Sequence, residues 1–383
     1  MKILHIFTQV STPRVFFDGQ FKYLADEGGH VIHLATTSDE DIDFSKRNNL
    51  NYHQIEIARK IDIKTDLKSI REIHKLIKKE KFDVVVGHTP KGALIAMIAA
   101  KLSGVKNRVY YRHGFIYTTA TGLKRKLFMA IEKLTSSLAT KVVNVSPSIA
   151  KLAVKDGLTK EKKQVVFGLG TCGGIDTKGR FNPELVSEKT KEVLRNKFGI
   201  TKSDFIIGYC GRFCKEKGTR ELIDGFISFR KNNIGLNPKL LLIGYYDNRD
   251  HLPERYKNLI DIDKDIILAG RISNSKLAPF YSLVNAFVFP SYREGFGMTV
   301  IEASAMGIPV LVSKSHGCLD SIKENETGEY IEISAEGIEK GLESMKDSEK
   351  RKRFGGNGRK FVVENFDHTV LWPQILEFYK IFK

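Results

Sequence analysis

Long apolar runs are missing from this 383-residue sequence. A membrane-spanning helix needs about 20 consecutive apolar residues, and the nearest approach, the run from Ala93 to Ala100, is closed off by Lys91 and Lys101. The opening segment MKILHIFTQV holds one Lys and too short an apolar run for a signal peptide. We therefore expect a cytoplasmic protein without a membrane-spanning helix.

Cysteine is also scarce, and no metal site is predicted. Four cysteines are too few for a disulfide framework. Only Cys210 and Cys214 are close in sequence, and they lack the second pair that would complete a zinc site. Asp261 and Asp263 have the spacing of an acidic metal-binding pair, but they precede a predicted strand and are interpreted as a solvated loop.

Acidic residues are outnumbered, and the deficit lies in one half of the chain. The formal net charge is +17; residues 1–180 carry 31 Lys and Arg against 17 Asp and Glu, whereas residues 181–383 carry 31 against 28. The basic excess could meet nucleic acid, an anionic membrane or an anionic substrate, or it could simply keep the protein soluble. Charge alone does not choose among these.

Apolar residues are plentiful enough for two cores. Hydrophobic residues make up 42% of the chain and aromatic residues 10%, which excludes an intrinsically disordered chain. At about 100 to 200 residues per domain, the length favours two domains.

Short β-branched runs alternate with segments of helical spacing, and this alternation occurs twice. In the first half, strands are predicted at 2–7, 30–36, 82–88, 108–113 and 141–146, and helices at 19–27, 63–81, 91–102 and 123–138. After a linker at 168–184, strands are predicted at 205–211, 239–244, 265–270, 286–291 and 309–314. Near-continuous apolar strands that alternate with helices indicate parallel sheets covered on both faces.

The predicted fold class is therefore α/β, with two Rossmann-like doubly wound domains facing a central cleft. We expect an N-terminal domain over residues 1–170, a C-terminal domain over 171–366, and a last helix over 367–383 that packs back on the N-terminal domain. In such sheets, ligands bind at the carboxyl ends of the strands, where the strand order reverses.

The most informative stretch is SYREGFGMTVIEASAMGIPVLVS at 291–313. Glu294 and Glu302 are separated by seven residues, and we expect EGFG to open a helix with Glu302 about two turns into it. An ionised Glu accepts bidentate hydrogen bonds, so the two carboxylates could hold two pairs of hydroxyls. The alternative is an ordinary helix with acidic residues near a favourable dipole. The start of this helix offers unpaired backbone N–H groups that suit phosphate or sugar oxygens, and these belong to Gly297, Met298 and Thr299.

This stretch resembles the Glu-x7-Glu signature of retaining glycosyltransferases of family 4, which have the GT-B fold. Two further segments resemble the same family in the same order, GYCGRFCKEKG at 208–218 and ILAGRIS at 267–273. The resemblance implies that Arg212 and Lys217 hold the diphosphate of a nucleotide-sugar donor. Two fixed cations are also what a departing diphosphate needs if no metal is present.

The resemblance further assigns the rest of the donor site. Glu302 would bind the ribose hydroxyls and Glu294 the transferred sugar, while Arg271 and Ile272 would lie beside the nucleobase. The remaining donor contacts are expected from Gly295, Phe296, Gly297, Met298 and Thr299. No cofactor and no divalent cation are expected.

The N-terminal half is expected to hold the acceptor. His113 stands where the family places a histidine close to the anomeric carbon of the donor, although a core or loop histidine is the alternative. Gly19 in FFDGQ is the sole candidate for close backbone approach to the diphosphate, in a loop with fewer glycines than is usual for the family. Lys91 is expected either near an acceptor phosphate or as a first-turn surface residue.

The segments at 88–108 and 168–176 resemble the branch of the family that builds bacterial capsule, O-antigen or carrier-linked oligosaccharides. Members of that branch use UDP-sugars and acceptors carried on a polyprenyl diphosphate at the inner face of the plasma membrane. The helix at 122–134 interleaves cations with Leu and Phe, as an interfacial helix does. We expect this helix to bind anionic lipid reversibly through Lys124, Arg125 and Lys126.

The sequence therefore predicts a retaining, metal-independent glycosyltransferase, peripheral to the inner membrane. A UDP-sugar epimerase of the same fold, which would convert the donor without an acceptor, is one alternative. A basic nucleic-acid-binding protein is a remote one, since no recognition helix or aromatic stacking platform is evident.

Overall fold

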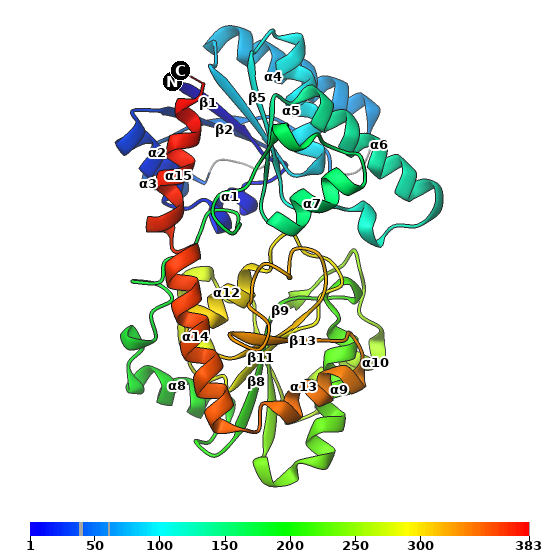
Figure 1. Ribbon diagram of the computed structural model, residues 1–383, viewed down its shortest axis with the longest axis vertical. Helices are drawn as coiled ribbons and strands as arrows, with labels where there is room; N and C mark the ends of the chain where they lie inside the picture. Colours follow the sequence, from blue (N-terminus) through cyan, green and yellow to red (C-terminus); the bar gives the residue numbers. More distant parts are fainter. Residues whose placement is uncertain (38–40, 60–61, 383) are drawn as a thin grey trace. The chain divides into compact units, whose positions relative to one another are not determined.

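The computed structural model describes residues 1–37, 41–59 and 62–382. This part of the chain folds into two compact units, each built on one sheet (Figure 1). Unit 1 comprises residues 1–174 together with the chain from 368 onward, and unit 2 comprises residues 175–367.

The division falls after Gly174 rather than at residue 170. Two hydrogen bonds explain the difference. The Thr171 amide donates to the Val145 carbonyl at 2.6 Å, and the Tyr111 hydroxyl donates to the Cys172 carbonyl at 2.7 Å. The start of the predicted linker is therefore part of unit 1.

Seven parallel strands form the sheet of unit 1, in the order β3-β2-β1-β4-β5-β6-β7. The strands are β1 (Lys2–Ile6), β2 (Val31–Thr36), β3 (Leu50–Gln54), β4 (Val84–His88), β5 (Asn107–Arg112), β6 (Lys141–Asn144) and β7 (Gln164–Val165). The helices are α1 (Ser11–Phe16), α2 (Gln20–Gly28), α3 (Ile42–Arg47), α4 (Ile63–Glu80), α5 (Pro90–Leu102), α6 (Gly122–Leu138), α7 (Pro147–Lys155) and α15 (His368–Lys380).

The central strands of unit 1 are buried along almost their whole length. Every residue of β4 is buried, and only Lys2 of β1 is partly exposed. A strand covered on both faces has no solvent side, so its sequence shows no polar alternation. The core between this sheet and its helices includes Leu4, Val85 and Ala96.

Six parallel strands form the sheet of unit 2, in the order β10-β9-β8-β11-β12-β13. The strands are β8 (Phe205–Phe213), β9 (Pro238–Tyr246), β10 (Ile266–Gly270), β11 (Ala286–Phe289), β12 (Val310–Ser313) and β13 (Gly328–Ile331). The helices are α8 (Glu188–Phe198), α9 (Thr219–Asn232), α10 (Glu254–Ile262), α11 (Ala278–Tyr281), α12 (Met298–Ala305), α13 (Ala335–Ser344) and α14 (Ser348–Phe366).

Each sheet has a point where its strand order reverses. In unit 1, β1 lies between β2 and β4. In unit 2, β8 lies between β9 and β11. Doubly wound sheets bind ligands at the carboxyl ends of the strands beside such a point. The loops after β1, β4, β8 and β11 are therefore the places to look for a site.

The last helix of the chain belongs to unit 1. Helix α15 packs against α2, and the Trp372 indole N–H donates to the Gly173 carbonyl at 2.7 Å. Among the described residues, none of the helices combines the length and the apolar character needed to cross a membrane.

Candidate functional site

The cation Arg212 lies at the carboxyl end of β8, beside the strand reversal of unit 2. Its guanidinium forms an ion pair with Asp247, which follows β9, and lies 3.5 Å from Glu216. Arg249 also binds Asp247, at 3.0 Å. Hydrogen bonds from Arg249 and Arg212 hold the pKa of Asp247 well below its usual range. Arg212 is thus a fixed cation at the end of the strand.

Lys217 and Glu294 meet at the same edge of the sheet. Lys217 ends the short 3-10 helix η4 (Lys215–Lys217) after β8, and Glu294 follows β11. Their side chains form an ion pair and are only 12% and 15% exposed. The Lys217 ammonium also lies 3.4 Å from the Arg293 carbonyl oxygen. The fold thus pairs one of the two predicted diphosphate cations with the predicted sugar-binding carboxylate.

Glu302 is buried inside unit 2 on helix α12. The Tyr281 hydroxyl donates to its Oε2 at 3.0 Å, and burial raises the pKa of Glu302 to about 7. Glu302 lies about one turn into α12, not the two turns expected, because the helix begins only at Met298, after Gly297 in the left-handed conformation. Residues 294–297 are therefore a loop rather than a first helical turn.

The start of α12 carries an unsatisfied hydroxyl. Thr299 Oγ1 is buried and has no hydrogen-bond partner among the described residues. Phe296 is buried against Phe366, with ring centroids 5.1 Å apart, so only its backbone is available for contact with a ligand. A Cβ atom at Gly317 would lie 2.6 Å from the Gly295 carbonyl oxygen, and its φ of +87° also favours glycine. Gly317, which sequence reasoning missed, lets a second loop approach this segment.

Arg271 and Ile272 follow β10. The Arg271 guanidinium lies over the Tyr245 ring, 5.1 Å from its centroid, and Ile272 is half-buried. A ring and a guanidinium at the carboxyl end of neighbouring strands form a flat surface suited to a planar group.

In unit 1, His113 is held on both sides of its ring. It follows β5, its Nε2 lies 3.1 Å from His88 Nδ1, and its Nδ1 lies 3.5 Å from Cys172 Sγ. Burial lowers the pKa of His113 to about 4, so the imidazole is neutral near pH 7. Its predicted contact with the donor or acceptor stays a prediction.

Gly19 and Lys91 are both engaged within unit 1. The Gly19 amide donates to Asn48 Oδ1 at 2.7 Å, its φ is +82°, and a Cβ there would lie 3.0 Å from the Trp372 ring. Lys91 forms an ion pair with Asp66 of α4 at 2.6 Å, with its side chain 15% exposed. These contacts give each residue a role in the fold, and their ligand roles stay predictions.

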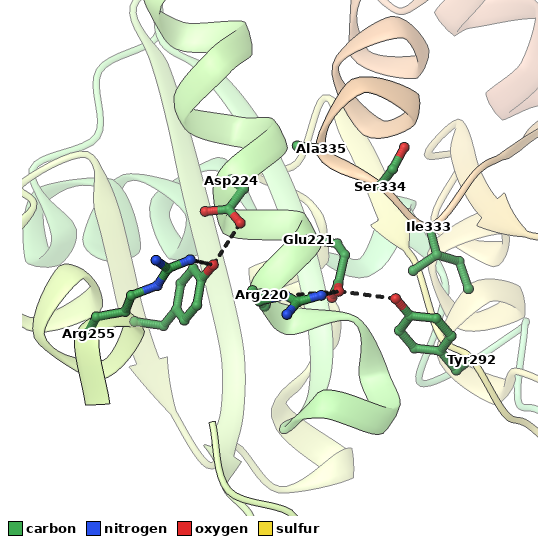
Figure 2. Close-up of a pocket in the computed structure, with 9 residues that line it drawn as sticks. Arg220, Glu221, Asp224, Arg255, Tyr292, Ile333, Ser334 and Ala335 are labelled. Atoms are coloured by element: carbon green, nitrogen blue, oxygen red, sulfur yellow. Dashed lines mark hydrogen bonds and ion pairs between the residues drawn. The ribbon is translucent and has the colours of Figure 1, made fainter. Parts of the chain in front are cut away.

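A pocket of about 310 Å³ in unit 2 lies apart from the predicted donor residues. Figure 2 shows its charged side chains turned toward partners within the pocket. Tyr292 donates to Glu221 at 3.0 Å and Tyr256 donates to Asp224 at 2.7 Å. Because Tyr292 lies two residues before Glu294, its hydrogen bond to Glu221 helps to hold the segment that carries the predicted sugar-binding carboxylate.

Several of these partners were not predicted from the sequence. Asp247, Glu216 and Arg293 form one ionic network with Arg212, and Arg293 lies 2.5 Å from Glu216. No motif signals them, because their proximity depends on where neighbouring strands end. Among the described residues, no group of three or more His, Cys, Asp or Glu side chains is arranged to hold a metal ion.

Two family models match the chain. Residues 190–361 match the model of glycosyl transferases group 1, and residues 6–146 match the glycosyl transferase 4-like model. The chain is 32% identical over 387 aligned residues to the capsular polysaccharide biosynthesis glycosyltransferase CapM of Staphylococcus aureus, covering 100% of this chain and 97% of the relative. It is 24% identical to an Escherichia coli UDP-Gal:alpha-D-GlcNAc-diphosphoundecaprenol alpha-1,3-galactosyltransferase, over 73% of this chain and 70% of that protein.

Solved structures match the fold over the full chain. The Anabaena protein Alr3699/HepE, in complex with UDP and glucose, has a TM-score of 0.81 at 15% identity and covers 99% of each chain. A glycosyltransferase from Rickettsia africae has a TM-score of 0.79 at 20% identity, over 100% of this chain and 98% of that one. The predicted family and fold class are confirmed: the chain belongs to the group 1 glycosyltransferases and is a glycosyltransferase with two Rossmann-like units, the GT-B fold.

Proposed function

We propose that this glycosyltransferase moves a hexose or N-acetylhexosamine from a UDP-sugar to a hydroxyl of a polyprenyl-diphosphate-linked saccharide, in the synthesis of a bacterial surface polysaccharide. The ion pair between Lys217 and Glu294 carries the proposal, since it joins the cation predicted to bind the diphosphate to the carboxylate predicted to bind the sugar, beside the strand reversal. The similarity to a capsular enzyme along the whole chain, and to an enzyme named for an undecaprenol-linked acceptor, supports the pathway and the acceptor.

The donor is proposed to lie along the carboxyl edge of the unit 2 sheet. Arg212 and Lys217 bind the diphosphate. The Thr299 hydroxyl, which has no hydrogen-bond partner among the described residues, donates a hydrogen bond to an oxygen of the nucleotide sugar. Glu302 binds the ribose hydroxyls. Arg271 and Ile272 lie beside the base, where the Tyr245 ring adds a stacking surface.

Transfer is proposed to proceed with retention at the anomeric carbon and without a divalent cation. As the diphosphate departs, Arg212 and Lys217 stabilise the negative charge that develops on it. No residue of the matched motifs is an obvious covalent nucleophile, so the acceptor hydroxyl attacks the short-lived oxocarbenium-like species on the face that the diphosphate leaves, and its proton passes to the departing diphosphate. Neutral His113 is proposed to hydrogen-bond the sugar or the acceptor at the reacting centre.

A donor screen followed by product analysis tests this function. We expect one UDP-sugar to raise the melting temperature of the protein, because a ligand that binds only the folded state stabilises it. With that donor and a polyprenyl-diphosphate-linked saccharide, NMR is expected to show a product with the anomeric configuration of the donor, at a rate that EDTA leaves unchanged.

The same experiment distinguishes the alternatives. An inverted product would overturn retention, and loss of rate in EDTA with recovery on adding Mg²⁺ would overturn metal independence. Conversion of the UDP-sugar to an epimer in the absence of acceptor would instead identify an epimerase, which the similarity to transferases does not favour.

The protein is further proposed to dock on the anionic inner face of the plasma membrane through the first two turns of α6. Leu123 and Leu127 are 84% and 49% exposed, and Lys124, Arg125 and Lys126 beside them are exposed as well. The helix has one carboxylate, Glu132, and it is buried against Arg112 and Tyr110. Helix α6 therefore presents cations and leucines with no exposed negative charge, at the margin of unit 1 (Figure 1).

Vesicle sedimentation checks this docking. Each Lys or Arg near an anionic surface contributes about 1 kcal/mol, so replacing Lys124, Arg125 and Lys126 by alanine is expected to weaken binding to phosphatidylglycerol-containing vesicles by about 100-fold. The matched control replaces Lys189, Lys202 and Lys352, which are exposed lysines of unit 2, and is expected to leave binding unchanged. Equal binding of the wild type to neutral and anionic vesicles would contradict the proposal.

A further inference from the structure

Three histidines stand on neighbouring strands at the reversal point of unit 1. His5 lies in β1, His88 ends β4, and His113 follows β5. The strand register explains why they meet. His5 is opposite Val86, two residues before His88, and His88 is opposite Tyr111, two residues before His113. Because side chains two apart on a strand share a face, the three imidazoles form a diagonal row on one face of the sheet.

The row is joined by hydrogen bonds and has a different group at each end. His5 Nδ1 lies 2.9 Å from His88 Nε2, and His88 Nδ1 lies 3.1 Å from His113 Nε2. At one end the Tyr379 hydroxyl of α15 lies 3.5 Å from His5 Nε2, and at the other the Cys172 sulfur lies 3.5 Å from His113 Nδ1. We call these five side chains the histidine chain.

The three imidazoles share one orientation, with Nε2 toward Tyr379 and Nδ1 toward Cys172. Burial lowers the pKa of His5 to about 3 and that of His88 well below its usual value, so the rings are neutral near pH 7. A neutral imidazole has one N–H donor and one bare acceptor nitrogen. The histidine chain can therefore be fully hydrogen-bonded in only two ways: all three imidazoles carry the proton on Nδ1, or all three carry it on Nε2.

The two ends decide between these arrangements. Tyr379 is 3% exposed, and His5 is the one hydrogen-bond partner of its hydroxyl among the described residues. If it donates to His5, the protons lie on Nδ1 throughout; if it accepts, its own buried O–H is left unsatisfied, which is costly. A thiol is a weak donor and cannot impose the opposite direction as strongly.

We propose that Tyr379 is a positioning residue that fixes His113 in the tautomer with its proton on Nδ1. A sulfur is a weak acceptor, so the Nδ1–H group of His113 readily exchanges its hydrogen bond to Cys172 for one to a stronger acceptor. His113 therefore presents a hydrogen-bond donor to an oxygen of the donor sugar or of the acceptor. This consequence rests on the proposed role of His113 in transfer, whereas the tautomer itself does not.

The surroundings of the histidine chain keep it rigid. The Phe7 ring stacks on His88 with centroids 3.8 Å apart and an interplanar angle of 12°. Thr89 and Thr171, next to His88 and Cys172, have positive φ values of 61° and 96°, which are strained for β-branched residues. Strain of this kind persists where the surrounding structure imposes it and is concentrated at functional sites.

Long-range ¹⁵N–¹H correlation spectra of histidine-labelled protein test the assignment, since protonated and bare imidazole nitrogens resonate at well separated ¹⁵N frequencies. We expect His5, His88 and His113 to carry their protons on Nδ1 in the wild type. In Tyr379→Phe, all three histidines are expected to shift together toward the Nε2–H form. Adding Cys172→Ser to that variant places the stronger hydroxyl donor at the other end and is expected to complete the shift.

Kinetics then connect the tautomer to transfer. Tyr379→Phe is expected to lower kcat by about tenfold, the equivalent of one hydrogen bond, with a smaller change in KM. The control Tyr117→Phe removes a tyrosine hydroxyl of unit 1 that is bonded to Asp156 at 2.6 Å, and it is expected to change neither spectrum nor rate.

Two results would overturn the proposal: a wild-type His113 protonated on Nε2, or a Tyr379→Phe spectrum identical to that of the wild type. A shifted tautomer with an unchanged kcat would remove the positioning role. A wild-type protein that transfers no sugar would count against the proposed function alone, because the spectra need no substrate.

Discussion

Replacing Lys217 by alanine is expected to lower kcat/KM for sugar transfer by about 10²- to 10³-fold, the usual effect of removing a donor that stabilises charge developing in a transition state. Lys217 is one of the two cations proposed to bind the diphosphate, and it is shielded from solvent, so its charge acts through less water than a surface lysine does. The change also leaves the Glu294 carboxylate without its ion-pair partner. Steady-state rates with the donor found by the thermal-shift screen provide the measurement.

A matched set of variants separates chemistry from folding. Lys314, which is 65% exposed and paired with Glu324, is the control lysine in the same unit, and Lys314→Ala is expected to leave kcat/KM unchanged. The double variant with Lys217→Ala and Glu294→Gln is expected to lose less than the sum of the two single effects, because the residues form one ion pair. A Lys217→Ala enzyme with kcat/KM within threefold of the wild type and a native melting temperature would rule out the diphosphate role.

Glu302→Gln is expected to raise the Kd for UDP by about 10- to 100-fold and to reduce its dependence on pH to the part that comes from the terminal phosphate of UDP. A carboxylate accepts hydrogen bonds from two ribose hydroxyls, and hydrogen bonds to a charged group contribute about 1.5 to 3 kcal/mol. With the pKa of Glu302 raised to about 7, wild-type Kd is expected to rise as the pH falls from 8 to 6, because the carboxylate is protonated over that range. Titration calorimetry at pH 6, 7 and 8 measures both effects.

The same carboxyl group has the opposite effect on stability. Because its pKa in the folded protein is raised, its contribution is fully present below the ordinary pKa of 4.5 and is lost as the pH rises toward 7. The Glu302→Gln variant is therefore expected to bind UDP more weakly than the wild type. Its melting temperature is nevertheless expected to fall less than that of the wild type between pH 5 and pH 8. The exposed control Glu326→Gln is expected to change neither property. A wild-type Kd that is flat between pH 6 and pH 8 would contradict the assignment of Glu302.

The sequence predicted those elements of the fold that are buried on both faces of a sheet. Central strands such as β4 and β11 are buried throughout and mostly apolar, and each was predicted within a few residues. The strands β3, β7 and β13 lie toward or at the sheet edges and were not predicted, because sequences such as LNYHQ and GEYI have neither an apolar run nor clean alternation. Edge strands form because a neighbouring strand offers hydrogen bonds, which is not visible in their own residues.

The candidate site was predictable in part for a similar reason. Lys217 and Glu294 each belong to a motif, and both follow strands that meet at the reversal point. Asp247 and Tyr281 belong to no motif, and they reach Arg212 and Glu302 only through the ends of β9 and α11. The row of His5, His88 and His113 needs the register of three strands, so the same residues read separately gave no signal beyond His113.

The return of α15 to unit 1 has a consequence for the order in which the protein forms during synthesis. Unit 2 is one continuous stretch, 175–367, and every residue it needs is synthesised before helix α15. Unit 1 begins earlier but stays incomplete until Trp372 and Tyr379 have been made and pack against Tyr23 and His5. Unit 1 is thus begun before unit 2 but completed only after it, and the histidine chain can assemble only once Tyr379 has been made.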